Sequence, residues 1–533
     1  MMRLDRIQIH NYRPFVDFDL TLGGDSVTVV AANAGGKTAL LVAMSSALSG
    51  ARGLGRRDFH DLATPIEIVA TLKELEPDDQ SAFVDAVRFG GAEPTVDLGI
   101  RALWDEESQQ IDVTWGFPDR AWARAGRTTR ERIPLLTLPS YRDPARLLAF
   151  TGSRSVLEQL LASVDLDQPL DAAVSAVEAA LSDLVTAPET GSLLQLLKEG
   201  LSRLIPDVVP EAFQIEPAAS TSDELLDQFE LALAHAGPQM TIERQSSGLA
   251  QLAVFVVALR VAATRSAIVI VDEPETSLHP HAQRSLASAI QRESHQSIIA
   301  THSSSVLSRA DVRNVVRLKR EGGNVEAKRP STLSANDATK LARYATPETA
   351  EAFFARTVIF AEGPSDYLAL HAAADVLSVD LDARGAAVVS LQGASLLSIY
   401  LTLLGPNGLD LSLCGLCDLD AESEWRAKLQ AVGLNATSRA ALNSQGFYVC
   451  DIDLEDELIR AHGSTAVQSI IALEGEARKF SAFASQLPNR SLTLSEQLTE
   501  FVRKSKTRWS PKLVSELSAA SMPSPLRDVL ANA

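Results

Sequence analysis

Cysteines, aromatic residues and uninterrupted apolar runs are all scarce in this chain. Three cysteines among 533 residues cannot build a disulfide framework. The longest apolar stretch, residues 249–263, is interrupted by Gln251 and Arg260 and is shorter than the ~20 residues that a bilayer span requires. The opening sequence MMRLDRIQIH has no apolar core of a signal peptide. We therefore expect a cytoplasmic protein with no membrane segment, in which residues 249–263 form a buried helix.

Basic residues are also fewer than acidic residues. The chain has 49 Lys and Arg residues against 68 Asp and Glu residues, which gives a net charge of −19. This total argues against a polybasic coat for nucleic acid, although local patches decide phosphate binding. Apolar residues make up 46% of the sequence, enough for sizeable cores, and the length exceeds that of a usual single domain. We expect two to four folded units and no global disorder.

The spacing of apolar residues changes several times along the chain. Residues 4–31 and 64–135 show the alternation that is typical of strands, whereas residues 155–233 repeat with helical spacing. Strand and helix signals return in residues 241–320, and a second αβ series begins near Thr357. This order predicts an α/β protein with a helical insertion in its first part.

A hinge between two major parts is expected in residues 321–350, because this segment is rich in turn-forming residues. They are Gly322, Gly323, Pro330 and Pro347. The predicted boundaries give the segments 1–154, 155–235, 236–335 and 355–533.

A phosphate-binding loop is predicted between the apolar strand 27–30 and a following helix. The sequence Ala-Ala-Asn-Ala-Gly-Gly-Lys-Thr at 31–38 has glycines that let backbone amides converge on phosphate, a lysine to neutralise it and a hydroxyl for Mg²⁺. Ala31 stands where the pattern has its first glycine, so the tight turn must accommodate a Cβ. The candidate nucleotide-binding residues are Asn33, Gly35, Gly36, Lys37 and Thr38.

Two further apolar strands end in residues suited to nucleotide chemistry. The run 267–271 ends in Asp272 and Glu273, which places both carboxylates at the carboxyl edge of a parallel sheet. There, Asp272 can hold Mg²⁺ through water, and Glu273 can orient the attacking water. The next strand leads to His302, a candidate γ-phosphate sensor. Taken alone, this histidine would more often simply end a strand.

Upstream, Ser247 and Gly248 precede a long apolar helix whose N-terminus suits an anion, although helix capping alone would explain the serine. These four elements, in this order, resemble the heads of ABC-type ATPases of the RecF and SMC-like branch over about residues 1–320. The most specific part of the match is the segment 272–280. The resemblance implies ATP as a cofactor and composite sites in a dimer, with Ser247 and Gly248 acting in trans. No residue is assigned to the family's glutamine loop.

Acidic residues follow the strands of the second half. A strand at 357–361 leads into Glu362 and Asp366, whose spacing lets both face one cation. Another strand, 411–417, ends in Asp418 and Asp420, which alternation along an extended strand end would place on one side. Carboxylates at successive strand ends favour Mg²⁺ or Mn²⁺ over zinc, although any single acidic pair is more often a solvated turn.

The chain contains one C-x-x-C motif, formed by Cys414 and Cys417. Such a motif can mark redox or zinc chemistry. Here it lies inside the strand that leads to Asp418, and no second C-x-x-C is present in the sequence. We therefore interpret both cysteines as small core residues.

The order Glu-Gly, central strand, Asp-x-Asp resembles a Toprim domain over about residues 355–533. An ABC-type ATPase followed directly by Toprim is the arrangement of the OLD (overcoming lysogenization defect) family of nucleases. The resemblance implies an ATPase head in segments 1–154 and 236–335, a dimerisation insertion in 155–235 and a C-terminal Toprim domain. It also implies divalent-metal ligands, a ligand to a second ion, and a basic residue that stabilises the transition state. The implied metal ligands are Glu362, Asp366, Asp418 and Asp420. Glu455, chosen among several neighbouring acidic residues, is the implied ligand to the second ion. Lys506 is the implied basic residue.

Basic residues concentrate in two places despite the net negative charge. Residues 503–512 contain five basic residues and no acid, and residues 313–329 contain six basic and two acidic residues. We expect these patches to be able to meet DNA phosphates, and a solvated basic face is the alternative.

The combined pattern predicts an ATP-regulated, metal-dependent DNA endonuclease that works as a homodimer or a larger homo-oligomer. The family resemblance adds an association with phage defence or DNA repair, and in some members a helicase-like partner protein. A non-nucleolytic, RecF-like DNA-binding ATPase with a scaffolding Toprim module is the alternative. Topoisomerase chemistry is disfavoured because no tyrosine stands in a recognisable catalytic setting, and primase chemistry because template-binding modules are not recognisable.

Overall fold

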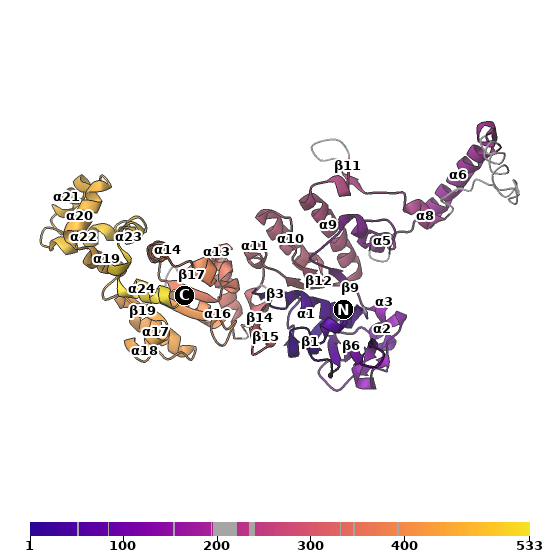
Figure 1. Ribbon diagram of the computed structural model, residues 1–533, viewed down its shortest axis with the longest axis horizontal. Helices are drawn as coiled ribbons and strands as arrows, with labels where there is room; N and C mark the ends of the chain where they lie inside the picture. The colour runs from indigo at the N-terminus through magenta and orange to yellow at the C-terminus, as the bar shows by residue number, and fades with distance from the viewer. Residues whose placement is uncertain are drawn as a thin grey trace.

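The computed structural model describes residues 1–533 apart from short gaps and one longer segment. The residues outside the description are 33, 51–52, 84, 153–154, 193–194, 196–220, 234–239, 331, 345–346 and 392–393. The chain forms two α/β lobes arranged side by side, with a helical arm that projects from the N-terminal lobe away from the C-terminal one (Figure 1). The predicted α/β class is confirmed.

The N-terminal lobe begins with an antiparallel sheet in the order β2-β1-β4-β6-β7-β8, with β5 paired to β6. Its strands are β1 (Arg3–Tyr12), β2 (Phe15–Thr21), β4 (Ile66–Lys73), β5 (Val87–Arg88), β6 (Thr95–Asp105), β7 (Gln110–Phe117) and β8 (Ala123–Arg124). Burial alternates along β4, where Ile66, Ile68, Ala70 and Leu72 all face the core. Period-two patterning therefore identified this sheet correctly.

The second sheet of this lobe positions the nucleotide residues. Its order is β15-β14-β3-β13-β12-β9, and the five strands from β14 to β9 are parallel. They are β3 (Ser26–Ala31), β9 (Leu135–Leu138), β12 (Ile268–Asp272), β13 (Gln296–Ala300), β14 (Val315–Glu321) and the antiparallel β15 (Asn324–Lys328). Every residue of β12 and β13 is buried, so their polar residues cluster at the carboxyl ends.

Helices fill the space around this sheet. Helix α1 (Lys37–Ser49) packs against strands of both sheets, and one apolar core spans the layer between them. Helices α4 (Pro144–Leu147), α5 (Val156–Leu161), α9 (Ser247–Arg265) and α10 (Pro280–Glu293) pack together, and α11 (Ser304–Leu307) contacts α10. By length and composition α9 could cross a membrane. Its buried face, which includes Val254, Phe255 and Ala258, instead belongs to the apolar core beside β12, as predicted for a buried helix.

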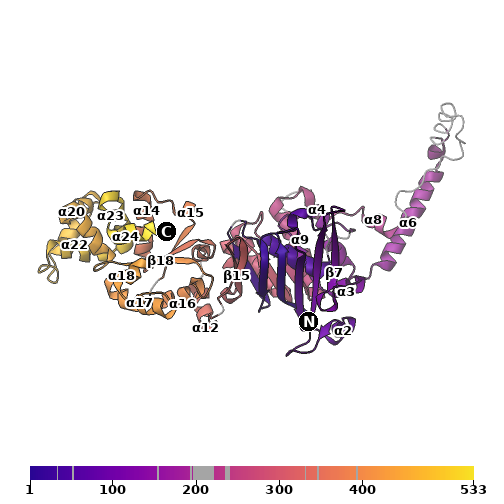
Figure 2. The ribbon, with the colours of Figure 1, turned by 60° about the horizontal axis from the view of Figure 1, so that its bottom comes forward.

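The arm contains α6 (Asp167–Thr186) and α8 (Ser222–Leu226) and extends away from both lobes (Figure 2). Helical spacing is confirmed for α5 and α6. The rest of the predicted insertion lies partly outside the described residues. Its role in dimerisation stays a prediction.

The expected hinge at 321–350 is wrong in its first part. Gly322 and Gly323, with φ of 55° and 94°, form the turn of the β14–β15 hairpin, so this stretch belongs to the nucleotide sheet. After β15, helices α12 (Ala335–Tyr344) and α13 (Pro347–Glu351) lead to the second lobe. Glycine pairs mark hairpin turns as well as linkers, and sequence spacing alone did not separate the two.

The C-terminal lobe is built on a parallel sheet in the order β17-β16-β18-β19. The strands are β16 (Thr357–Ala361), β17 (Ala386–Ser390), β18 (Ser412–Cys417) and β19 (Phe447–Val449). Apolar cores lie on both faces of the sheet. The helices are α14 (Pro364–Val376), α15 (Leu381–Arg384), α16 (Ala394–Leu404), α17 (Glu422–Ala431), α18 (Arg439–Ser444), α19 (Leu454–His462), α20 (Ser464–Leu473), α21 (Ala477–Ala484), α22 (Leu494–Arg503), α23 (Lys506–Ser515) and α24 (Ser524–Ala531).

The cysteines of β18 are core residues, as predicted. Cys414 and Cys417 are 2% exposed, and both are free thiols. Burial raises the pKa of Cys414 to about 12 and also raises the pKa of Cys417. Neither thiol is therefore suited to redox or metal chemistry at neutral pH.

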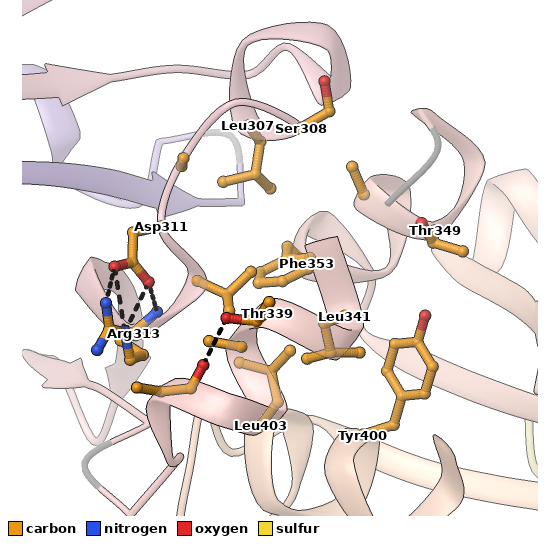
Figure 3. A pocket seen from close by; sticks show the side chains of 15 residues that line it. Leu307, Ser308, Asp311, Arg313, Thr339, Leu341, Thr349, Phe353, Tyr400 and Leu403 are labelled. Carbon is orange, nitrogen blue, oxygen red and sulfur yellow. Dashed lines mark hydrogen bonds and ion pairs between the residues drawn. The ribbon is translucent and has the colours of Figure 1, made fainter. Parts of the chain in front are cut away.

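Charged contacts join the two lobes. Arg317 of β14 donates from Nη1 to the carbonyl oxygens of Leu409 at 3.0 Å and Asp410 at 2.9 Å. Lys319 places Nζ 2.6 Å from Asp410 Oδ2. Beside this junction lies a cavity of about 220 Å³, lined by Leu307, Phe353 and other largely apolar side chains from both lobes (Figure 3). We call the contacts of Arg317 and Lys319 with residues 409–410 the junction latch.

Contact of the basic patch at 313–329 with DNA stays a prediction. Most of its basic side chains are used within the protein: apart from the two latch residues, Arg313 pairs with Asp311, Lys328 with Glu326, and Arg329 donates to the carbonyls of Thr21 and Leu22. A count of charges along the sequence does not reveal the acids and carbonyl groups that folding brings close from distant parts of the chain.

Candidate nucleotide and metal sites

The phosphate loop connects β3 to α1 and tolerates alanine at its first position. Ala31 is the last residue of β3, and it is not among the described non-glycine residues with positive φ. The left-handed conformations fall instead on Ala34, with φ of 60°, and Gly36, with φ of 95°. A Cβ at Gly35 would lie 2.5 Å from the Ala31 Cβ, so glycine is required at Gly35. Asn33 lies outside the described residues.

Lys37 supplies a buried positive charge at the start of α1. It is 5% exposed, and its Nζ lies 2.5 Å from His302 Nε2 and 3.4 Å from the Ala31 carbonyl oxygen. Burial lowers the pKa of Lys37, which the carboxylates of Glu273 and Asp272 oppose. Burial and the nearby lysine also lower the pKa of His302. An ammonium held beside a neutral imidazole fits a site for a terminal phosphate.

Thr38 and Asp272 form the predicted magnesium position. Thr38 Oγ1 donates to Asp272 Oδ2 at 2.8 Å, which brings the end of β12 against α1. The second oxygen, Asp272 Oδ1, is buried without a hydrogen-bond partner. Burial raises the pKa of Asp272. A hydroxyl beside an unpartnered carboxylate oxygen is a donor set that fits Mg²⁺ in a nucleotide site.

Glu273 lies next to this pair in a left-handed conformation, with φ of 47°. Its Oε1 lies 4.0 Å from His302 Nε2, and both side chains line a cleft of about 420 Å³ together with the phosphate loop. The cleft is also lined by Arg13 and Pro14, from the turn between β1 and β2, which sequence reasoning missed. Arg13 is held by an ion pair of 2.8 Å to Asp58. No motif marks this turn, so only the fold brings it to the loop.

Ser247 and Gly248 begin α9 and do not line this cleft. A Cβ at Gly248 would lie 2.8 Å from the Ser277 carbonyl oxygen, so glycine lets the helix start approach the turn after β12. Their predicted action on the nucleotide of a second subunit stays a prediction.

In the C-terminal lobe, Glu362 and Asp418 follow the neighbouring strands β16 and β18. The Asp418 amide donates to Glu362 Oε2 at 3.1 Å, so the structure brings these two predicted ligands together. Asp366 lies in the first turn of α14, is 9% exposed and accepts from the Gly363 amide at 3.0 Å. Parallel strand ends therefore gather the acidic residues at one edge of the sheet.

The carboxylates of this cluster strongly disfavour one another's charge. Burial, together with Asp366 and Glu362, raises the pKa of Asp418 to about 8. Burial and Glu455 raise the pKa of Asp366 to about 6, and burial raises the pKa of Glu362. Crowded oxygen ligands of this kind fit divalent cations, whose charge would relieve the repulsion. Among the described residues, no three His, Cys, Asp or Glu side chains are yet arranged at ligand distance.

The expected strand alternation of Asp418 and Asp420 is wrong. Strand β18 ends at Cys417, and Asp418 precedes a short 3₁₀ helix, Leu419–Ala421. Asp420 is exposed on this turn, whereas Asp418 is partly buried. The backbone leaves the extended conformation at the position where alternation was assumed.

The buried Glu455 and the partly exposed Lys506 form an ion pair beside the cluster. Glu455, on α19, is 1% exposed, and its Oε2 lies 2.8 Å from Lys506 Nζ. Its Oε1 accepts from Ser510 Oγ at 2.9 Å, a contact that sequence reasoning missed. Burial opposes the charge of Lys506, but the ion pair and the field of Asp418 raise the pKa of Lys506 overall. The lysine is therefore protonated and lies near the acidic cluster.

Contact of the predicted basic patch at 503–512 with DNA likewise stays a prediction, and most of its charges are ion-paired within the protein. Lys504 lies over the Phe483 ring at 4.3 Å. The other basic residues pair with acids of neighbouring helices: Arg503 with Asp453 and Glu500, Lys506 with Glu455, Arg508 with Glu474 and Glu476, and Lys512 with Glu474 and Glu516. The acids come from α19, α22 and the α20–α21 turn, apart from Glu516 at the end of α23 itself.

Comparisons with known proteins match each half of the chain to a family. Residues 32–308 match the family described as "AAA domain, putative AbiEii toxin, Type IV TA system", which covers more than half of the chain. Residues 353–420 match the family described as "Overcoming lysogenization defect protein-like, TOPRIM domain". The second match includes Glu362, Asp366, Asp418 and Asp420.

The OLD nuclease of Thermus scotoductus is 25% identical over 412 residues, which cover 73% of this chain and 77% of that protein. Among solved structures, the C-terminal region of the Burkholderia pseudomallei OLD protein is 26% identical, with a TM-score of 0.28, over 33% of this chain and 96% of that one. An Smc head domain from Pyrococcus furiosus is 14% identical, with a TM-score of 0.40, over 64% of this chain and 99% of that one. The chain therefore belongs to the AAA-domain family that matches residues 32–308, and it carries an OLD-like Toprim domain.

Proposed function

We propose that the protein is an ATP-regulated, divalent-metal-dependent DNA endonuclease, which nicks or cleaves phosphodiester bonds. The observation that carries the proposal is the contact between Glu362 and the Asp418 amide, with Lys506 of α23 near this acidic cluster and a phosphate loop in the same chain. Phosphoryl chemistry needs positioned charges of both signs, and this edge supplies them.

The chain's own residues contribute in distinct ways. Glu362, Asp366, Asp418 and Asp420 would hold one divalent cation, and Glu455 would serve a second. Such cations, when bound, activate water and stabilise the leaving oxygen. Lys506 holds a proton and a positive charge near the position of the scissile phosphate. Its ion pair with Glu455 fixes the ammonium in place.

Control by ATP is supported by the junction latch. Strand β14 pairs with β3, the strand that ends in the phosphate loop, and also carries Arg317 and Lys319. The residues they hold, 409–410, stand immediately before β18, which leads to Asp418. A shift of the loop strand on nucleotide binding would therefore reach the nuclease edge through two strands.

The wider biology follows from the same proposal. DNA is the substrate, and a homodimer or larger homo-oligomer would complete each ATP site with Ser247 and Gly248 of a second copy. A cytoplasmic role in phage defence or DNA repair is proposed from the family resemblance. A helicase-like partner stays a prediction of that resemblance.

Plasmid nicking tests the nuclease directly. Supercoiled plasmid is incubated with wild-type protein, Asp418→Asn and the matched control Asp382→Asn, an exposed residue of α15, each with Mg²⁺, Mn²⁺ or EDTA. Metal-dependent nicking by wild type and control, with loss in Asp418→Asn, is expected. Equal nicking by Asp418→Asn, or none by any protein, would remove the nuclease assignment.

A RecF-like DNA-binding ATPase is the second candidate. One observation favours it: in the part of the chain that the structure describes, no three acidic side chains are arranged at ligand distance. It predicts ATP-dependent DNA binding that is unchanged in Glu362→Gln, with no nicking by wild type. Fluorescence anisotropy of labelled duplex DNA, measured alongside the plasmid assay, separates the two functions.

A further inference from the structure

Arg142 lies behind the ATPase residues, in the segment after β9, and is 4% exposed. Its Nη1 donates to the carbonyl oxygens of Pro139 at 2.7 Å and Asp272 at 2.9 Å. Its Nη2 donates to the carbonyl oxygen of Glu273 at 3.0 Å, and its Nε donates to Gln251 Oε1 at 2.8 Å. Of the five donor hydrogens of a guanidinium, four therefore have fixed acceptors.

This charge is buried without an ion pair in the described part of the chain. Burial lowers the pKa of Arg142, and the more distant carboxylates of Glu275, Asp272 and Glu273 oppose that shift. Burying a charge costs several kcal/mol unless hydrogen bonds replace its water. Here, three of the four replacements are backbone carbonyls, and two of these belong to Asp272 and Glu273, which we call the catalytic turn.

The catalytic turn is strained at Glu273. A non-glycine residue with φ of 47° costs about 1–3 kcal/mol and persists only where its surroundings hold it. The Glu273 amide donates to the Ala300 carbonyl oxygen at 2.9 Å, and Arg142 binds the Glu273 carbonyl from the other side. The two contacts fix the peptide units on both sides of the Glu273 Cα, and so fix where its carboxylate enters the cleft.

Gln251 extends the same network to α9. It lies one turn after Ser247, is 9% exposed, and donates from Nε2 to the Arg142 carbonyl oxygen at 3.0 Å. The Arg142 side chain and backbone thus both bind this amide. Because α9 begins with the residues expected to meet the second subunit, the network connects that surface to Glu273.

We propose that Arg142 is a positioning residue for ATP hydrolysis, which holds the Asp272–Glu273 backbone in its reactive geometry and joins it through Gln251 to α9. The inference rests on the proposed ATPase activity. Arg142 does not line the nucleotide cleft, so it acts on turnover and not on ATP binding. A lysine cannot replace it, because only the planar guanidinium donates in several fixed directions at once.

Steady-state ATP hydrolysis by Arg142→Lys tests the proposal, with Arg146→Lys, an exposed arginine of α4, as the matched control. Displacement of a reacting group by about 1 Å can cost about 100-fold in rate, so kcat is expected to fall roughly 100-fold in Arg142→Lys while KM stays within about threefold. If Arg142 were merely structural, its substitution would lower the melting temperature but would not lower kcat selectively at a nearly constant KM.

Gln251→Leu keeps the test decisive if Arg142→Lys does not fold. This variant removes the link to α9 but leaves the three carbonyl contacts, so kcat is expected to fall by about tenfold. In the double variant, kcat is expected to be no lower than in Arg142→Lys alone, because both changes break one network.

Three results would overturn the proposal. A wild-type kcat in folded Arg142→Lys or Gln251→Leu would overturn the positioning role of Arg142 but not the ATPase assignment. A raised KM with unchanged kcat would do the same. No ATP hydrolysis by wild type and Arg146→Lys would overturn the ATPase assignment together with the positioning role.

Discussion

The nucleotide site and the Toprim edge use the same strand-end architecture with opposite charge. In the first, Lys37 and Arg142 are buried cations, and burial lowers the pKa of each. In the second, the buried Asp366 and the partly buried Asp418 have pKa values that are raised to about 6 and about 8. One site is prepared for an anionic phosphate and the other for cations. The comparison explains how one chain can keep two phosphoryl-transfer centres chemically separate.

The largest expected effect separates the two centres. Lys37→Ala removes the buried charge that faces the terminal phosphate, so ATP turnover should fall about 10³-fold, the cost of losing several kcal/mol of charge stabilisation. Metal-dependent nicking without ATP should persist, because the Toprim edge keeps every carboxylate. Phosphate release and plasmid nicking, measured on the same preparation, check this. Simultaneous loss of both activities in a folded variant would contradict the separation.

The ligand response of unfolding sharpens the comparison. At 100 times the dissociation constant, a ligand adds about 2.7 kcal/mol to the free energy of unfolding. Mn²⁺ without nucleotide should raise the melting temperature of wild type and Lys37→Ala but not of Asp418→Asn. ATP added at a constant Mg²⁺ concentration should do the reverse, stabilising Asp418→Asn but not Lys37→Ala. Differential scanning fluorimetry gives all six shifts, and the same response in both variants would argue against two independent sites.

The junction latch should connect the two centres at a smaller cost. Lys319→Ala removes the contact with Asp410, and Arg320→Ala, at an exposed position of the same strand, is the control. Coupling between sites is typically about 1–3 kcal/mol, so the effect of ATP on nicking should shrink by about 5-fold or more in Lys319→Ala. ATP turnover and ATP-free nicking should stay near wild type. An unchanged ATP effect would show that coupling follows another route.

The smallest expected effect concerns Ala31. Because its φ is not positive, Ala31→Gly brings no conformational relief and weakens the end of β3 by about 0.5–1 kcal/mol. Urea unfolding should show this loss, with ATP kcat and KM within about threefold of wild type. Faster turnover in Ala31→Gly would mean that alanine restrains the loop after all.

Local patterns predicted the elements that carry most of the chemistry. Asp272 ends one short, fully buried strand and Glu362 follows another. The sequence shows this signal because each acid stands next to an apolar run. Arg13, Arg142 and Ser510 were missed because their partners lie far away along the chain. Arg142, for example, contacts residues 109 and 130 positions away.

The predictions that the structure corrects or leaves open have the same origin as the missed residues. Residues 503–512 form a run of positive charge only in the sequence, because folding pairs most of it with acids from other segments. Asp420 was misplaced because a 3₁₀ turn interrupts the strand periodicity at Asp418. Sequence periodicity reports the environment of an element, whereas charge pairing depends on how elements assemble.

Calorimetric titration of Mn²⁺ into nucleotide-free protein tests most directly whether the Toprim carboxylates are a cation site. Wild type and Lys37→Ala should bind Mn²⁺ with the same stoichiometry and affinity, whereas Asp418→Asn should lose at least one ion. Equal Mn²⁺ binding by Asp418→Asn and wild type would contradict the account.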